Sequence, residues 1–122
     1  MTRCVLDTNA IIALLQGEAV LNLHTNIQWI GVSIISILEF LSFSDLSSGD
    51  RKLFEKFVSR VDVVNLSVNN HRYLELAISI RKETKLKLPD ALIAASAIHN
   101  KATLITKDSQ LSGIAGLKVI GW

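Results

Sequence analysis

The sequence predicts an α/β protein with a mainly parallel sheet and helices on both of its faces. Short apolar runs, typical of buried strands, alternate along the whole chain with segments of helical periodicity, and such alternation favours parallel strands joined by right-handed crossovers. Apolar residues make up 49% of the 122 residues, which is enough for one hydrophobic core. We therefore expect residues 1–122 to form a single domain.

The expected strands are short runs of apolar or β-branched residues, at positions 4–6, 29–32, 61–66, 103–106 and 118–120. Helices are expected at positions 10–16, 19–25, 34–44, from 50 onward, 69–84 and 90–99. Gly17 ends the first helix, Ser33 caps the third, and Pro89 begins the last, where its missing N–H costs nothing. Because the last helix is apolar nearly all round, we expect it to be buried.

Several classes of protein are excluded by composition. Cys4 is the only cysteine, so neither a disulfide framework nor a multi-cysteine zinc site is possible, and we expect Cys4 in the core. The longest apolar-rich stretch, residues 30–43, is too short to span a bilayer and contains Glu39. No signal peptide is recognisable at the N-terminus. The expected protein is soluble and cytoplasmic, with no contact with a membrane.

Acidic residues stand where the predicted fold would bring them together. Asp7 directly follows the first strand, Asp108 follows the fourth, and Asp90 lies in the first turn of the last helix. The carboxyl ends of parallel strands meet at one edge of a sheet, so these side chains are expected to converge. Each of the three, taken alone, has a second interpretation as a helix cap or as a charge that stabilises a helix N-terminus.

Glu39 is different, because its helical neighbours are apolar or small and the helix is expected to be largely buried. A buried carboxylate requires compensation by a metal ion, a basic partner or a hydrogen-bond network. Clustered carboxylates also repel each other unless cations neutralise them, and hard oxygen ligands select Mg²⁺ or Mn²⁺. Two such ions can stabilise the attacking and leaving oxygens of a phosphoryl displacement.

The four acids lie in segments 5–9 (Val-Leu-Asp-Thr-Asn), 36–40 (Ser-Ile-Leu-Glu-Phe), 87–95 (Lys-Leu-Pro-Asp-Ala-Leu-Ile-Ala-Ala) and 103–108 (Thr-Leu-Ile-Thr-Lys-Asp). In this order they resemble the four motifs of PIN domains, and most closely those of the VapC toxins of bacterial toxin–antitoxin systems. The third segment is the most specific. The chain departs from many relatives after the fourth, where Leu111-Ser112 replaces an Asp-Phe pair.

The resemblance implies a three-layer α/β/α sandwich that acts as a metal-dependent endoribonuclease and toxin. Asp7, Glu39, Asp90 and Asp108 would then be the catalytic residues and the ligands of one or two Mg²⁺ or Mn²⁺ ions. Asn9 and Thr106 resemble the family's supporting amide and hydroxyl. The resemblance further implies a homodimer and a small VapB-like antitoxin as partner. The alternative is a catalytically inactive relative that keeps the fold as an interaction module.

A basic segment leads into the third motif and is the candidate contact with RNA. It contains Arg81, Lys82, Lys85 and Lys87. Two other classes fit the chain less well. A phospho-receiver domain would need a pair of acids after the first strand, and a haloacid-dehalogenase-like phosphatase would need an acid where Asn9 stands.

Overall fold

The computed structural model describes residues 2–21 and 26–122. Its strands form one sheet in the order β3-β2-β1-β4-β5, and every pairing is parallel. The strands are β1 (Thr2–Leu6), β2 (Ile27–Ser33), β3 (Asp62–Val64), β4 (Thr103–Ile105) and β5 (Val119–Ile120). The expected parallel sheet is therefore confirmed.

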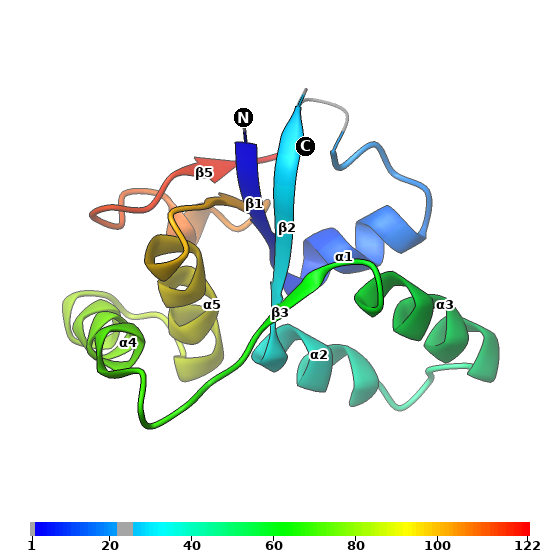
Figure 1. The fold of residues 1–122 in the computed structure, drawn as a ribbon, viewed down its shortest axis with the longest axis horizontal. Coiled ribbons are helices and arrows are strands. Elements are labelled where there is room, and N and C mark those ends of the chain that lie inside the picture. Colours follow the sequence, from blue (N-terminus) through cyan, green and yellow to red (C-terminus); the bar gives the residue numbers. More distant parts are fainter. Residues whose placement is uncertain (1, 22–25) are drawn as a thin grey trace.

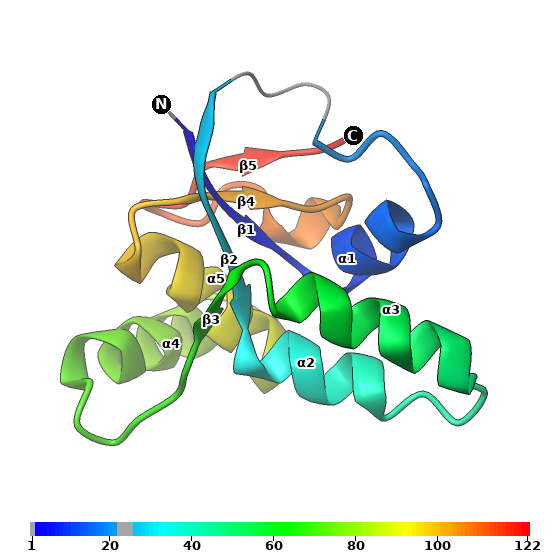
Figure 2. The same ribbon diagram turned by 45° about the vertical axis from the view of Figure 1, so that its right-hand side comes forward.

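Helices cover both faces of this sheet, as predicted. They are α1 (Thr8–Leu15), α2 (Ile34–Leu41), α3 (Ser48–Val58), α4 (His71–Glu83) and α5 (Leu88–His99), with a 3₁₀ turn η1 (Ser109–Leu111) after β4. Figures 1 and 2 show α4 and α5 on one side of the sheet and α1, α2 and α3 on the other. The arrangement is a three-layer α/β/α sandwich.

Each face of the sheet has its own hydrophobic core, because alternate residues of a strand point to opposite faces. Val5 packs with the cluster under α4 and α5, whereas Cys4 and Leu6 pack with the cluster under α1, α2 and α3. Cys4 is buried, as expected. The rings of Phe40 and Phe54 stack with centroids 4.0 Å apart and so join α2 to α3.

Helix α5 lies between the sheet and α4, and the prediction that it is buried is confirmed. Residues 91–97 are all buried in the structure. The hydroxyl of Tyr73 on α4 donates a hydrogen bond of 3.0 Å to the carbonyl oxygen of Leu92. This packing places the first turn of α5, with Asp90, at the carboxyl edge of the sheet.

Some predicted boundaries were wrong. Helix α3 begins at Ser48 rather than Asp50, because Ser47 caps it by accepting the amide of Asp50 at 3.0 Å. Strand β3 is shorter than predicted, since it pairs only with the last three residues of β2. Of the helix expected at 19–25, residues 19–21 are not helical and residues 22–25 lie outside the described residues. In the described part of the chain, no helix is long and apolar enough to cross a membrane.

Candidate active site

The four predicted acids line one cavity at the carboxyl edge of the sheet. Asp7 follows β1, Glu39 lies on α2, Asp90 lies in the first turn of α5, and Asp108 follows β4. All four border a cavity of about 220 Å³, which we call the acidic cavity. Its remaining lining residues are Thr8, Asn9, Phe43, Ile93 and Leu111. Side chains that are distant in sequence therefore meet at one place.

Two of these acids are also helix caps. Asp7 Oδ1 accepts the amide of Ala10 at 2.7 Å, and Asp108 Oδ1 accepts the amide of Gln110 at 2.9 Å. The capping interpretation thus describes real contacts of Asp7 and Asp108. It does not exclude a second role, because a carboxylate has two oxygens and about four acceptor positions.

The expectation that Glu39 sits in a largely buried helix was wrong. Only Ser36 and Phe40 of α2 are buried, and Leu38 is 56% exposed, because the helix packs through one face alone. Glu39 is half-buried, and its Oε1 accepts a hydrogen bond of 2.7 Å from the hydroxyl of Thr8. The carboxylate of Glu39 is therefore partly compensated by a hydrogen bond, where a metal ion, a basic partner or a hydrogen-bond network was expected. Sequence reasoning missed Thr8, although the residue stands directly after Asp7.

Thr106 connects two of the acids. Its hydroxyl oxygen accepts the amide of Asp108 at 3.0 Å, and its hydrogen bond to Asp7 lowers the pKa of that carboxyl. Thr106 is only 2% exposed and directly follows β4, and its amide donates to the carbonyl oxygen of Ile120 at 3.0 Å. Asn9 is exposed and lines the acidic cavity on the first turn of α1.

The electrostatics of the cavity are those of crowded like charges. Burial is the main cause that raises the pKa of Asp7, against hydrogen bonds from Thr106 and Ala10, and the charges of Asp108 and Asp90 raise it further. The pKa of Asp90 is raised by burial, then by Glu39 and Asp108, while Lys87 opposes the shift. The ionised forms of these carboxyls are therefore disfavoured until a cation approaches.

The four carboxylates around the cavity are chemically suited to bind a hard divalent cation. Carboxylate oxygens are the ligands that Mg²⁺ and Mn²⁺ prefer. Within residues 2–21 and 26–122, however, no three His, Cys, Asp or Glu side chains are already grouped tightly enough to hold one ion. The carboxylates surround the cavity at a wider spacing, which is the arrangement that mutual repulsion favours.

The structure separates the four basic residues of the candidate RNA contact. Lys85 and Lys87 line a groove of about 690 Å³ that Asp90 and Asp108 also border, and we call it the lysine groove. Arg81 instead donates from Nη1 to the carbonyl oxygen of Leu86 at 2.7 Å, which holds the loop after α4. Lys82 is exposed but does not line this groove.

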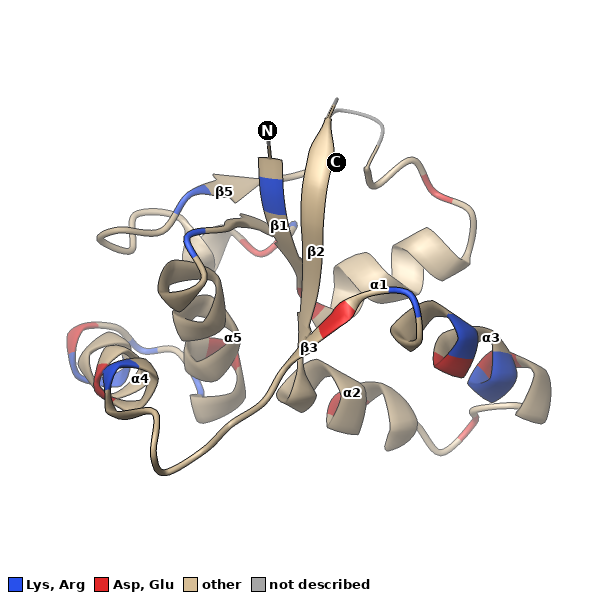
Figure 3. Cartoon of the chain, in the orientation of Figure 1, with Lys and Arg blue, Asp and Glu red and all other residues tan. Residues whose placement is uncertain are grey.

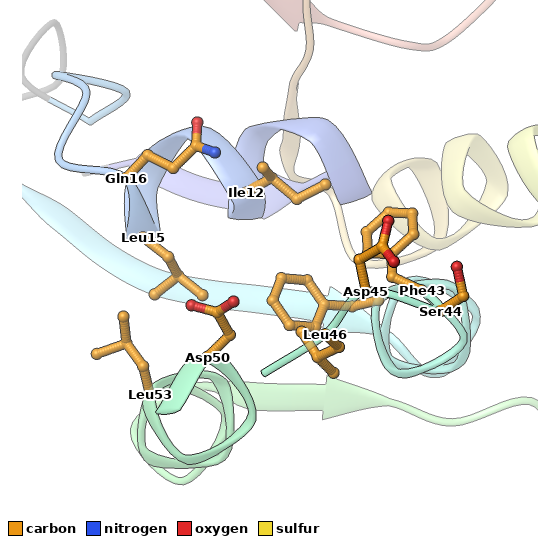
Figure 4. Close-up of a pocket in the computed structure, with 10 residues that line it drawn as sticks. Ile12, Leu15, Gln16, Phe43, Ser44, Asp45, Leu46, Asp50 and Leu53 are labelled. Carbon is orange, nitrogen blue, oxygen red and sulfur yellow. The ribbon is translucent and has the colours of Figure 1, made fainter. Parts of the chain in front are cut away.

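An apolar groove that sequence reasoning did not identify lies beside the acidic cavity. It has a volume of about 350 Å³ and runs between α1, α2 and α3 (Figure 4). Its lining residues are Ile12, Leu15, Gln16, Phe40, Phe43, Ser44, Asp45, Leu46, Asp50 and Leu53. Phe43 borders both this apolar groove and the acidic cavity, so the two are neighbours. Phe43 and Leu53, which line this groove, are 48% and 47% exposed.

The fold and the cavity together define an α/β protein with a carboxylate cluster at the edge of a parallel sheet. Residues 4–117 match the PIN domain family, and the chain belongs to that family. No curated protein sequence matches the chain significantly.

Solved structures with a similar fold include a toxin–antitoxin complex from Klebsiella pneumoniae. That protein is 27% identical, the match covers 96% of this chain and 95% of that one, and the TM-score is 0.77. VapBC2 from Rickettsia felis, bound to a DNA fragment from its promoter, is 24% identical over 99% of each chain with a TM-score of 0.79. VapBC-1 from nontypeable Haemophilus influenzae is 22% identical over 99% of this chain and 98% of that one, with a TM-score of 0.73.

Proposed function

We propose that this PIN domain protein is a metal-dependent endoribonuclease and the toxin of a toxin–antitoxin pair. The observation that carries the proposal is the convergence of Asp7, Glu39, Asp90 and Asp108 on one cavity, where burial and repulsion raise the pKa of two of them. Such a cluster attracts divalent cations and repels the phosphodiester unless they are bound. The four carboxylates would hold one or two Mg²⁺ or Mn²⁺ ions.

The residues of the chain have separate roles in this mechanism. When bound, the metal would lower the pKa of a water molecule and stabilise negative charge on the phosphoryl oxygens. Thr8 orients Glu39 through its hydrogen bond of 2.7 Å, and Thr106 favours the ionised form of the Asp7 carboxyl by lowering its pKa. Lys85 and Lys87 would bind phosphates of the RNA strand along the lysine groove.

The experiment is cleavage of a pool of labelled RNAs and DNAs by the purified chain, with Mn²⁺ or with EDTA. We expect RNA to be cut only with metal and to leave 5′-phosphate and 3′-hydroxyl ends, because water attacks phosphorus directly. Asp90→Asn should abolish cleavage, whereas Asp45→Asn, outside the acidic cavity, should not.

Products ending in 2′,3′-cyclic phosphate would contradict the mechanism, since they report attack by the RNA's own 2′-hydroxyl. Absence of cleavage under every condition would favour the alternative, an inactive PIN domain that serves as an interaction module.

We further propose an antitoxin as the partner, because solved structures of similar fold are described as toxin–antitoxin complexes. The apolar groove would take an apolar helix face of that partner. A cationic tail would then extend past Phe43 toward the carboxylates of the acidic cavity. Leu53 is 47% exposed in the groove, so Leu53→Glu should weaken rescue by the antitoxin without affecting cleavage.

A homodimer is also proposed. Apolar side chains are exposed on α4 and at the start of α5, where Ile78 is 45% and Leu88 is 53% exposed. Burying such side chains against a second copy would remove them from water. Light scattering of the purified chain at micromolar concentration measures this directly, and a monomer would contradict the proposal.

A further inference from the structure

A basic groove lies at the end of the sheet opposite the acidic cavity. Arg3 on β1, Lys101 after α5 and Lys118 before β5 line it, and its volume is about 470 Å³. The other lining residues are uncharged: Thr2, Ala97, Ile98, Ala102, Thr103 and Gly116. We call it the amino-edge groove. We propose that it binds phosphates of the RNA substrate at a distance from the cleaved bond, an inference that rests on the proposed ribonuclease function.

The charge of this groove is not balanced by carboxylates. None of its lining residues is acidic. Figure 3 shows the three basic segments around the amino ends of β1 and β5 and the end of α5. In the described part of the chain, the one ion pair is Arg51–Glu55 on α3, so neither Arg3, Lys101 nor Lys118 is paired there. Three unpaired cations around a polar groove favour an anionic ligand.

Arg3 is already held in place for such a ligand. Its Nε donates to the carbonyl oxygen of Asn100 at 2.9 Å, and its guanidinium carbon lies 4.2 Å from the centroid of the Trp29 ring. The indole N–H of Trp29 donates to Asp62, which fixes the ring in turn. The terminal amino groups of Arg3 have no hydrogen-bond partner among the described residues. A guanidinium fixed in this way loses little entropy when it binds phosphate oxygens.

Lys101 occupies a backbone position that glycine normally fills. Its φ is 54°, and it follows the C-cap Asn100 of α5. The amide of Ala102 bonds to the carbonyl of Ala97 at 2.9 Å, and the amide of Lys101 bonds to Ile98 at 3.1 Å, which is the pattern of a Schellman motif. A lysine in this left-handed conformation is unfavourable for the backbone, although its charge favours the helix C-terminus. Lys101, the residue with this unfavourable backbone conformation, is also one of the three basic residues that line the groove.

The distance between the two sites sets the kind of RNA that would use both. Asp90 and Lys101 lie near opposite ends of α5, eleven residues apart, which corresponds to about 16 Å along the helix axis. An RNA strand must extend several nucleotides beyond the cleaved bond to reach this far. The amino-edge groove should therefore contribute to binding of longer RNAs only.

The test is the binding of a fluorescently labelled single-stranded RNA of about 16 nucleotides, measured by anisotropy in EDTA at several salt concentrations. The variant is Lys101→Gln/Lys118→Gln. Its matched control is Lys52→Gln/Lys56→Gln, which removes the same charge from exposed positions on α3. Since each phosphate contact adds about 0.7 to the log–log salt slope, the variant should flatten the slope by about 1.4 and raise Kd about 25-fold at about 0.1 M salt. The control should leave both unchanged.

Lys101→Gly separates binding from folding. If Lys101 serves the groove, glycine should raise Kd about fivefold while the melting temperature stays the same or rises. Equal loss of binding in the variant and its control, or unchanged Kd in Lys101→Gly, would overturn the proposal, as would tighter binding of duplex DNA than of RNA.

Because the assay is done in EDTA, its result does not depend on cleavage. Failure of the ribonuclease itself appears separately, in the mapping of product ends with Mn²⁺.

Discussion

Replacing Asp7 separates the charge of this residue from its role as a helix cap. Asp7 is 8% exposed, and its Oδ1 accepts the amide of Ala10 at 2.7 Å. Asparagine can accept the same hydrogen bond and caps helices as well as aspartate does. Because burial and neighbouring carboxylates raise the pKa of Asp7, its ionised form is unfavourable in the metal-free protein. We expect Asp7→Asn to abolish cleavage and to leave that protein as stable or more stable at neutral pH.

Asp7→Ala measures how much the helix cap contributes to the stability of the fold. Alanine removes the charge and also leaves the buried amide of Ala10 without its acceptor. Loss of a cap costs about 1 kcal/mol, and for a domain of this size that lowers the melting temperature by about 4 °C. The alanine variant should therefore melt about 4 °C below the asparagine variant, while both are inactive.

The direction in which the stability of the folded protein changes with pH follows from the raised pKa of Asp7. A carboxyl whose pKa is raised by folding binds its proton more tightly in the folded state, so stability falls as pH rises above the unfolded value of about 3.9. The advantage of Asp7→Asn over the wild type should therefore grow as pH rises from about 4 toward neutrality. It should disappear at lower pH, where the carboxyl is protonated in both states.

Thermal melts in EDTA across this pH range, beside a cleavage assay with Mn²⁺, measure these quantities. Adding Mn²⁺ should stabilise the wild type by about 2.7 kcal/mol at about 100 times its Kd, and should stabilise Asp7→Asn less. The reasoning would be refuted by an asparagine variant that is as unstable as the alanine variant, does not respond to metal differently from the wild type, and still cleaves RNA.

Two further predictions concern Glu39 and the toxin. Thr8→Val removes the hydrogen-bond donor to Glu39, so it should lower the stability by about 1 kcal/mol and slow cleavage. Thr8→Ser keeps a hydroxyl and should retain the stability and the cleavage rate of the wild type. If the two variants behave alike in melts and kinetics, the hydroxyl has no role. Expression of the wild type alone should slow bacterial growth, and expression of Asp90→Asn should not; growth curves that are identical for both would remove the support for a toxin.

Much of the fold was accessible from local sequence patterns. The strands are apolar runs, and α5 was recognised as buried because apolar residues surround it on nearly all sides. The places of Asp7 and Asp108 followed from one property of parallel sheets, since residues shortly after the ends of such strands share an edge. The position of Asp90 in the first turn of α5 followed from Pro89, which begins helices without losing a hydrogen bond.

Other features depend on what covers each helix, which periodicity does not reveal. The pattern of α2 was apolar enough to suggest burial, yet Leu38 faces away from the core because the helix packs through one face only. The apolar groove likewise depends on how α1, α2 and α3 pack together, since residues from all three helices line it. The partner of Glu39 was also not predictable, because Thr8 lies 31 residues earlier in the chain.

The class of fold, the parallel sheet and the edge where the acidic residues gather follow from local propensity and from the direction of the strands, so they can be read from the chain. Which side chains share a surface depends instead on how the helices and strands pack. Lys85 and Lys87 face the lysine groove whereas Arg81 is bound to a carbonyl oxygen, and Arg3 meets Lys101 and Lys118 only because β1 lies beside β4 in the sheet. The physical reason is that strand order and helix packing bring distant residues together, and no local pattern carries that information.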